Sequence, residues 1–262
     1  MAHRPGLAAV CPSGSGTRQG YAFQLGRFEL VGPFRAGGID IIGGARIASS
    51  LVDARIAVLA SGAGTNLQAL LDDPHIGPCI VLLVADKPGV TALHRARARG
   101  VKSVALEPAH YRSREAFDRA LTTLLEEEAI EYLMLAGFMR ILGADTVRAF
   151  RDRILNVHPS LLPAFPGAHA VRDALDWGAK VTGATVHLVD EEVDHGPTVL
   201  QEPVVILPDD DERSLHLRIQ EVEHRLFPRA ARLMLEGRLK LEGRLVHVLG
   251  DDAETVGAGP TE

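Results

Sequence analysis

The chain of 262 residues contains only two cysteines, Cys11 and Cys79. Two thiols are too few for a disulfide framework or a four-thiolate metal site, so the composition indicates a reducing compartment and a cytoplasmic protein. No apolar run approaches the roughly 20 residues that a membrane span requires. The first residues also lack the apolar core of a signal peptide. We therefore expect no membrane partner.

An excess of basic residues is also absent. The net charge is −6 at pH 7, which argues against a nucleic-acid partner. The basic segment at 94–99 is therefore interpreted as a solvated helix face. Eleven histidines raise the question of a metal site, but none occurs in an H-E-x-x-H motif and no C-x-x-C pair is present. His187 and His195 flank Asp194, yet the sequence does not show that they face a common ion. We expect no metal.

Residues 1–54 differ in composition from the rest of the chain. They are rich in glycine, serine and arginine, and turn residues interrupt the two short apolar segments at 28–31 and 39–42. We expect a poorly ordered N-terminal extension, with a small regulatory subdomain as the alternative. Residues 55–249 are expected to form one domain, and residues 250–262 a C-terminal tail.

From residue 55 the hydrophobic pattern becomes regular. Apolar runs predict strands at 56–60, 80–85, 101–106, 132–136 and 154–157, and the segments between them predict helices at 67–71, 91–99, from 113 onward and at 145–150. Residues 181–189 and 199–207 predict two strands with no helix between them, followed by a long helix at 212–235 and a last strand at 239–249, a candidate edge strand. The fold class is therefore α/β: an open, mostly parallel twisted sheet with helices on both faces and an antiparallel C-terminal part.

A glycine-rich loop, Ser61-Gly62-Ala63-Gly64-Thr65-Asn66, lies between the first predicted strand and its helix. Backbone N–H groups at a helix N-terminus bind anions, and glycines let a phosphate approach closely. A dinucleotide fingerprint requires a third glycine where this chain has Leu67. Asp86, however, ends the second strand, where a ribose-binding acid would lie. The loop favours a single phosphate, with a dinucleotide site or a purely structural turn as alternatives.

Polar side chains lie at the end of the strand predicted at 154–157. Asn156 and His158 are two residues apart and share one face, and Pro159 ends the strand. Asp194 lies in a turn between the next two strands. A carboxylate beside an imidazole fixes its tautomer and raises its pKa, and an amide stabilises a developing oxyanion. The set predicts carbonyl chemistry by proton transfer; the alternative is a capping amide and a structural histidine. Ser160 lacks the G-x-S-x-G elbow of a nucleophile.

The chain from residue 55 to about 241 resembles the phosphoribosylglycinamide formyltransferase family. The resemblance is carried by SGAGTN at 61–66, SREAFD at 113–118, AGFMRIL at 136–142, NVHPSLLP at 156–163, DEEVDHGP at 190–197, and Glu-His at 223–224 before Pro228. Thr65 stands where the family often has serine, which keeps the hydroxyl. The extension at 1–54 has no counterpart in short members of the family.

The resemblance implies a Rossmann-like formyltransferase fold and a one-carbon transfer in purine biosynthesis. The formyl group of 10-formyltetrahydrofolate, a co-substrate, would pass to the glycinamide amine of 5-phosphoribosylglycinamide. Gly64, Thr65 and Asn66 would hold the phosphate, with Glu223 near the amine or the ribose. The implied folate-binding residues are Arg114, Met139, Arg140, Ile141 and Leu142. Only small-molecule partners are expected, for a monomer or homodimer.

The same resemblance assigns the chemistry to Asn156, His158 and Asp194. Asn156 and protonated His158 would stabilise the oxyanion, while Asp194 orients His158 and helps a water to move the proton. Formyltetrahydrofolate deformylase, which lets water attack, shares this set and is the nearest alternative. That family, however, carries an N-terminal regulatory domain and a histidine in place of Pro159. Methionyl-tRNA formyltransferase, with its basic C-terminal domain, and a dinucleotide-binding regulatory module fit less well.

Overall fold

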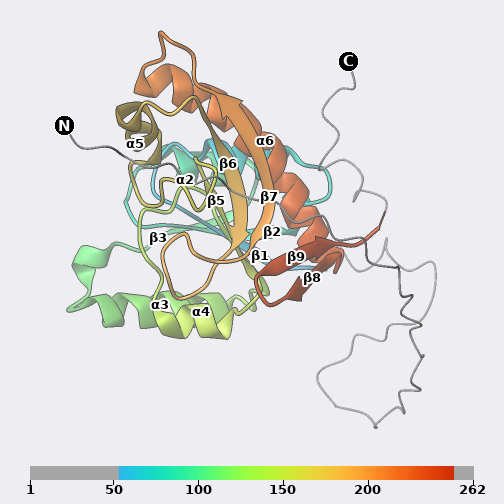
Figure 1. Ribbon diagram of the computed structural model, residues 1–262. Coiled ribbons are helices and arrows are strands. Elements are labelled where there is room, and N and C mark those ends of the chain that lie inside the picture. The colour runs from blue at the N-terminus through green and yellow to red at the C-terminus, as the bar shows by residue number, and fades with distance from the viewer. Residues whose placement is uncertain (1–52, 251–262) are drawn as a thin grey trace, which may run out of the picture. The chain divides into compact units, whose positions relative to one another are not determined.

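The computed structural model describes residues 53–250. The expectations for residues 1–52 and 251–262, an extension and a tail, lie outside the described residues. Within the described range, six α-helices surround a seven-stranded sheet, and a two-stranded sheet follows the last helix (Figure 1). No helix between residues 53 and 250 is both long and apolar enough to cross a bilayer.

The large sheet has the strand order β3-β2-β1-β4-β5-β6-β7. Its strands are β1 (Ile56–Ala60), β2 (Ile80–Ala85), β3 (Lys102–Ala105), β4 (Tyr132–Leu135), β5 (Ile154–His158), β6 (Val181–Leu188) and β7 (Thr198–Val205). The first five strands are parallel, whereas β6 and β7 are antiparallel to their neighbours. The predicted fold class is therefore confirmed.

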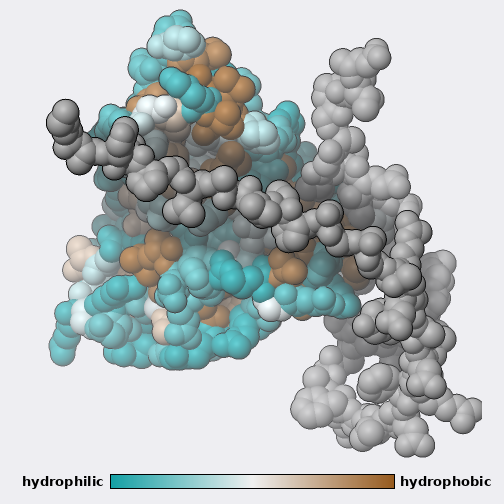
Figure 2. All heavy atoms as spheres, viewed as in Figure 1, coloured by the Kyte–Doolittle hydropathy of each residue, from teal (hydrophilic) through white to brown (hydrophobic). Residues whose placement is uncertain are grey.

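The helices lie on both faces of this sheet (Figure 1). They are α1 (Thr65–Asp72), α2 (Thr91–Ala98), α3 (Arg114–Glu127), α4 (Ala144–Ala149), α5 (Ala170–Trp177) and α6 (Glu212–Leu235), with short 3-10 turns at Gly77–Cys79 and Pro108–His110. In α3, Phe117, Leu121 and Leu125 face inward. The outward face of α3 and α4 is mostly hydrophilic (Figure 2), as expected of amphipathic helices that cover a sheet.

Strand β1 is buried on both faces, because it lies in the middle of the sheet. Ile56, Val58 and Ala60 belong to the core beneath α1, α2 and α6. Ala57 and Leu59 point the other way, into the core beneath α3 and α4. Side chains alternate between faces along a strand. A central parallel strand therefore reads as a continuous apolar run, which is the pattern that the sequence shows.

Two elements differ from the sequence predictions. Residues 239–249 do not form one edge strand but a hairpin, β8 (Leu239–Glu242) and β9 (Leu245–Val248), because Gly243 adopts a positive φ of 62° and turns the chain. Helix α5 was not predicted from the sequence. It is only eight residues long and buries Ala170, Val171 and Ala174.

The loops after β1 and β4 are joined at the carboxyl edge of the parallel strands. The Ser61 N–H donates to the Gly137 carbonyl at 3.1 Å, and the Met139 N–H donates to Ser61 Oγ at 2.9 Å. Open α/β sheets bind ligands at this edge. One serine therefore holds the glycine-rich loop against the segment at 137–142.

We expect any residue with a side chain to be destabilising in place of Gly64. Its φ is 70°, and a Cβ there would lie 2.8 Å from Ala92 Cβ and 2.9 Å from Ala92 Cα. We expect Gly64→Ala to lower the free energy of unfolding by about 1–3 kcal/mol, measured by urea denaturation. Gly62→Ala is the matched control, because a Cβ at Gly62 meets nothing within 4 Å. Equal losses in the two variants would contradict this account.

Candidate active site

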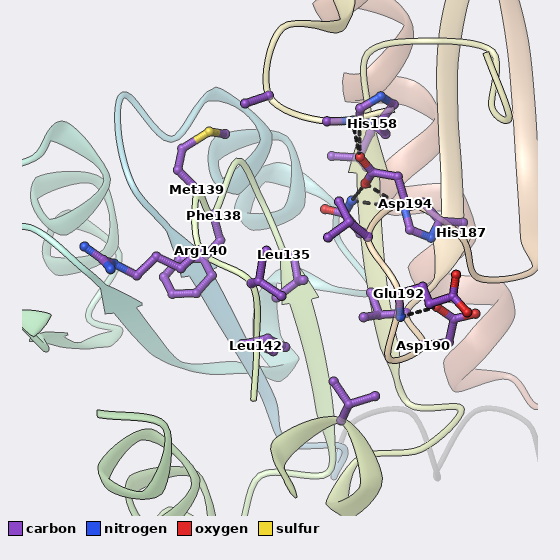
Figure 3. A pocket seen from close by; sticks show the side chains of 18 of the residues that line it. Leu135, Phe138, Met139, Arg140, Leu142, His158, His187, Asp190, Glu192 and Asp194 are labelled. Atoms are coloured by element: carbon purple, nitrogen blue, oxygen red, sulfur yellow. Dashed lines mark hydrogen bonds and ion pairs between the residues drawn. The ribbon is translucent and has the colours of Figure 1, made fainter. Parts of the chain in front are cut away.

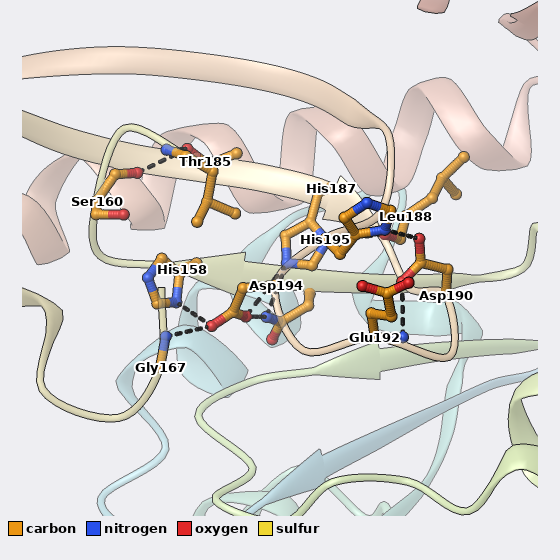
Figure 4. Close-up of polar contacts among 12 residues, drawn as sticks. His158, Ser160, Gly167, Thr185, His187, Leu188, Asp190, Glu192, Asp194 and His195 are labelled. Carbon is orange, nitrogen blue, oxygen red and sulfur yellow. Dashed lines mark hydrogen bonds and ion pairs between the residues drawn. The ribbon is translucent and has the colours of Figure 1, made fainter. Parts of the chain in front are cut away.

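The polar residues of β5 lie where the sheet changes from parallel to antiparallel. Asn156 is paired in register with His187 of β6, and His158 with Thr185. The loop at 189–197 leaves β6 and folds back along the sheet. It brings Asp194 into contact with both Asn156 and His158, and Figure 4 shows Asp194 beside His158. The three residues predicted to act together are therefore neighbours.

The Asp194 carboxylate is buried and contacts three segments. Its Oδ2 accepts from the Gly167 N–H at 2.7 Å and lies 3.4 Å from His158 Nδ1. Its Oδ1 accepts from Asn156 Nδ2 at 3.4 Å. Asp194 has a φ of 51°, a region that residues other than glycine rarely adopt. Its backbone is thus held in an uncommon conformation that aims the carboxylate at the two β5 side chains.

The proton on neutral His158 is placed by its other neighbour. Nε2 lies 2.9 Å from the carbonyl oxygen of Phe165. A carbonyl only accepts, so Nε2 carries the hydrogen and donates. Nδ1, which faces Asp194, is left as the nitrogen that takes up a proton. An imidazolium formed there would lie against a carboxylate.

Asp194 raises the pKa of His158, as predicted, but the net direction is downward. Burial lowers the pKa of His158, and it outweighs the Phe165 hydrogen bond and the Asp194 charge, which both raise it. The ring is neutral near pH 7 in this state. Burial also acts to raise the pKa of Asp194, but contacts with His187, the Gly167 N–H and His158 hold that pKa below its ordinary value. Asp194 is therefore ionised.

His187 joins the cluster, although the sequence assigned it no role. Its Nδ1 donates to the Leu188 carbonyl at 2.8 Å, so Nε2 accepts from Asn156 Nδ2 at 3.0 Å. Nε2 also lies 3.7 Å from Asp194 Oδ1. The signal that could have found His187 is its pairing opposite Asn156, which depends on the antiparallel register. His195, the other flanking histidine, is exposed and turns away toward Asp190.

A cavity of about 410 Å³ opens beside this cluster (Figure 3). Asn156, His158 and Asp194 lie on its polar side. The opposite side is mostly apolar and includes Leu135, Phe138, Met139, Arg140, Ile141, Leu142 and Val147. The predicted folate-binding segment at 139–142 thus lines the cavity. Arg114 does not, but its Nη2 donates to the Ile141 carbonyl at 3.1 Å and so contacts this wall.

Asp86 is engaged in a way that disfavours the dinucleotide hypothesis. It is 4% exposed, and its Oδ2 accepts from Arg140 Nε at 2.9 Å. The Arg140 guanidinium also lies 5.8 Å from the centre of the Phe117 ring. A ribose-binding acid must present a free carboxylate to the ligand. Here the carboxylate instead fixes a side chain of the cavity wall.

The glycine-rich loop and Glu223 form a second group, apart from the cavity lining. Gly64 precedes the first turn of α1, and Asn66 Nδ2 donates to Glu223 Oε2 at 2.9 Å. Burial raises the pKa of Glu223, against the hydrogen bond from Asn66. Thr65, at the start of α1, is half-buried beside them. The four residues predicted around the phosphate are therefore near one another.

The basic segment at 94–99 is more than a solvated face. Arg95 Nε donates to the Ala63 carbonyl at 3.0 Å, and its Nη1 donates to Gln68 Oε1 at 2.9 Å. Arg95 thus holds the glycine-rich loop from α2. Sequence periodicity placed it on the helix surface but did not show what that surface touches.

Across residues 53–250, no three histidine, cysteine, aspartate or glutamate side chains are grouped so that they could hold a metal ion.

Comparison with known proteins places the chain in a family. Residues 54–231 match the formyl transferase family. The phosphoribosylglycinamide formyltransferase of Mycobacterium tuberculosis is 44% identical over 193 residues, which cover 73% of this chain and 89% of that protein. The crystal structure of glycinamide ribonucleotide transformylase 1 from Symbiobacterium toebii matches with a TM-score of 0.74 and 46% identity, over 76% of this chain and 95% of that chain. The chain belongs to the formyl transferase family.

A larger protein is also similar. The trifunctional purine biosynthetic protein adenosine-3 of Drosophila melanogaster is 47% identical over 188 residues. These residues cover 70% of this chain but only 14% of that protein. The similarity therefore concerns one part of the trifunctional protein.

Burial of neutral histidines predicts acid sensitivity. Burial lowers the pKa values of His158, His216 and His224. As the pH falls below about 6.5, these histidines take up protons in the unfolded chain before they do so in the folded one. The free energy of unfolding therefore decreases as the pH falls from about 6.5 toward the lower pKa values of the folded state. We expect the free energy of unfolding, from urea denaturation, to decrease between pH 7.5 and 5.5. His216→Gln should reduce this slope, and an unchanged slope would refute the explanation.

Proposed function

We propose that this chain is a phosphoribosylglycinamide formyltransferase. It transfers the formyl group of 10-formyltetrahydrofolate to the glycinamide amine of 5-phosphoribosylglycinamide, in purine biosynthesis. The observation that carries the proposal is the position of Asn156, His158 and Asp194 on one side of a cavity whose other side is mostly apolar. The names of the similar proteins support the same activity.

The proposal assigns the activity to residues 55–249, with residues 1–54 and 250–262 as an extension and a tail. The enzyme acts in the cytoplasm on two small molecules, without a nucleic acid, a membrane or a metal, as a monomer or homodimer. The family match at 54–231 supports the placement of the domain.

The folate co-substrate occupies the cavity. Its volume falls within the few hundred Å³ that small-molecule sites usually offer. The pterin lies along Met139, Arg140, Ile141 and Leu142, and meets their backbone groups. Arg114, which already donates to the Ile141 carbonyl, meets the folate from the same side. An apolar wall with a few polar backbone groups suits a flat heterocycle.

The ribosyl phosphate binds at the glycine-rich loop. Backbone N–H groups of Gly64, Thr65 and Asn66 point from the N-terminus of α1, where the helix dipole favours an anion. Glu223, next to Asn66, meets the ribose or the glycinamide amine. The hydrogen bonds between Ser61 and residues 137–139 set the phosphate end of this substrate at a fixed distance from the folate wall.

In the reaction, the glycinamide nitrogen attacks the formyl carbon and the formyl oxygen becomes negative. Asn156 donates to that oxygen, which is typically worth about 3 kcal/mol in the transition state. The neutral His158 ring takes up the proton that the amine loses, and the Asp194 carboxylate stabilises the imidazolium. Charged His158 then stabilises the oxyanion. An ordered water passes the proton to the folate nitrogen as the carbon–nitrogen bond breaks.

Hydrolysis of 10-formyltetrahydrofolate is the second candidate, since the same three residues could activate a water. The names of the similar proteins favour transfer. The two activities are separated by one assay: the protein is mixed with 10-formyltetrahydrofolate, with and without 5-phosphoribosylglycinamide, and tetrahydrofolate release is followed. We expect release only with the amine. Release at the same rate without it would replace transfer by hydrolysis.

The catalytic assignment is tested by single substitutions. We expect Asn156→Ala, His158→Ala and Asp194→Ala each to lower kcat by about two orders of magnitude or more, because each removes a group that acts in the transition state. The fold should survive, as judged by circular dichroism. His247→Ala, on the exposed face of β9, is the control and should retain turnover. Near wild-type kcat in the His158 variant would remove the central claim.

The folate wall is tested at Ile141, which is 56% exposed at the cavity. Ile141→Asp places a charge that bound folate would strip of water, so KM for 10-formyltetrahydrofolate should rise by about tenfold. KM for 5-phosphoribosylglycinamide should change less than about twofold. Ile141→Val, which keeps the wall apolar, is the control. A rise in the second KM alone would place the folate elsewhere.

A further inference from the structure

The β8–β9 hairpin reaches the loop at 189–197, which carries Asp194. Three apolar side chains of the hairpin pack against the core beneath α6: Leu239, Val246 and Val248. The hairpin is thereby fixed to the body of the domain. Its turn consists of Gly243 and Arg244, and Arg244 extends to His195, the residue after Asp194.

Arg244 begins a chain of hydrogen bonds that crosses the loop. Its Nη2 donates to the His195 carbonyl at 2.5 Å, and its Nη1 lies 3.1 Å from His195 Nε2. His195 Nδ1 donates to Asp190 Oδ2 at 2.7 Å (Figure 4). Because Nδ1 carries the hydrogen, Nε2 has a lone pair for Arg244. Asp190 Oδ1 accepts the Glu192 N–H at 3.0 Å, so both carboxylate oxygens hold the loop.

We propose that Arg244 is a positioning residue for Asp194, acting through His195 and Asp190. Asp194 has a φ of 51°, and a conformation of this kind persists only where the surrounding structure holds it. The Gly167 N–H holds the side chain. Arg244 holds the backbone by its hydrogen bond to the carbonyl of His195, the residue that follows Asp194. The inference rests on the proposed role of Asp194 in formyl transfer.

A simple surface ion pair is the alternative, and such pairs contribute little. The contacts of Arg244 differ from that case, because its planar fork binds a backbone oxygen and a ring nitrogen of one residue. A second arginine, Arg148, lies 3.6 Å from Glu191 on the same loop but is also paired with Asp145. Arg244, in contrast, contacts the loop directly beside Asp194.

The first test compares Arg244→Gln with Lys240→Gln. Lys240 is a cation of the same hairpin and pairs with Glu242 rather than with the loop. We expect kcat to fall by about tenfold in Arg244→Gln, with both KM values nearly unchanged, because a small misplacement of a reacting group slows turnover more than binding. Arg244→Lys should recover part of the loss. An unchanged kcat, or an equal loss in Lys240→Gln, would overturn the proposal.

A second measurement needs no turnover: the titration of the His158 ring by NMR. Asp194 raises the pKa of His158, so a misplaced Asp194 should let that pKa fall further in Arg244→Gln. In an Asp194→Asn background the charge is gone, and Arg244→Gln should then leave the His158 titration unchanged. An equal shift in both backgrounds, or none in either, would overturn the positioning role.

The two measurements separate this inference from the proposed function. If the wild-type protein transferred no formyl group, the proposed function would fail. The His158 titration would still report whether Arg244 positions Asp194.

Discussion

A buried carboxylate must be surrounded by hydrogen-bond donors, and the site depends on how Asp194 meets this requirement. The donors come from segments that are distant in sequence: the Gly167 N–H after β5 and the Asn156 amide within β5. Each donor is in place only when the β5–β6 register is formed and the loop at 189–197 is closed. The polar cluster is therefore complete only once the sheet has formed and the loop is in place.

The sequence predicted the parallel half of the sheet well, because central strands such as β1 are buried on both faces and read as apolar runs. It also predicted that Asn156 and His158 share a face, since that follows from alternation alone. It could not place His187 or Arg244, because their positions depend on strand pairing and on a hairpin turn. It predicted that Asp194 raises the His158 pKa but not that burial lowers it by more, because the extent of burial is a property of the packed structure.

The hairpin at the end of the domain shows why local sequence signals are incomplete. Residues 239–249 carry enough apolar residues for one strand, and a single glycine decides that they form two. Helix α5 is a second case: it has only eight residues and was not predicted from the sequence, yet it packs on α6.

Ser61 joins the glycine-rich loop to the mostly apolar wall of the cavity through two hydrogen bonds, one from its backbone and one to its hydroxyl. Because the serine side chain is short, it allows little variation in the distance between the two segments. The spacing between two binding regions is thus encoded at one position rather than distributed along the loops. Insertions elsewhere in these loops could accumulate without altering that spacing. Exchanging this single serine for alanine would instead remove one of the two hydrogen bonds and leave the spacing less firmly fixed.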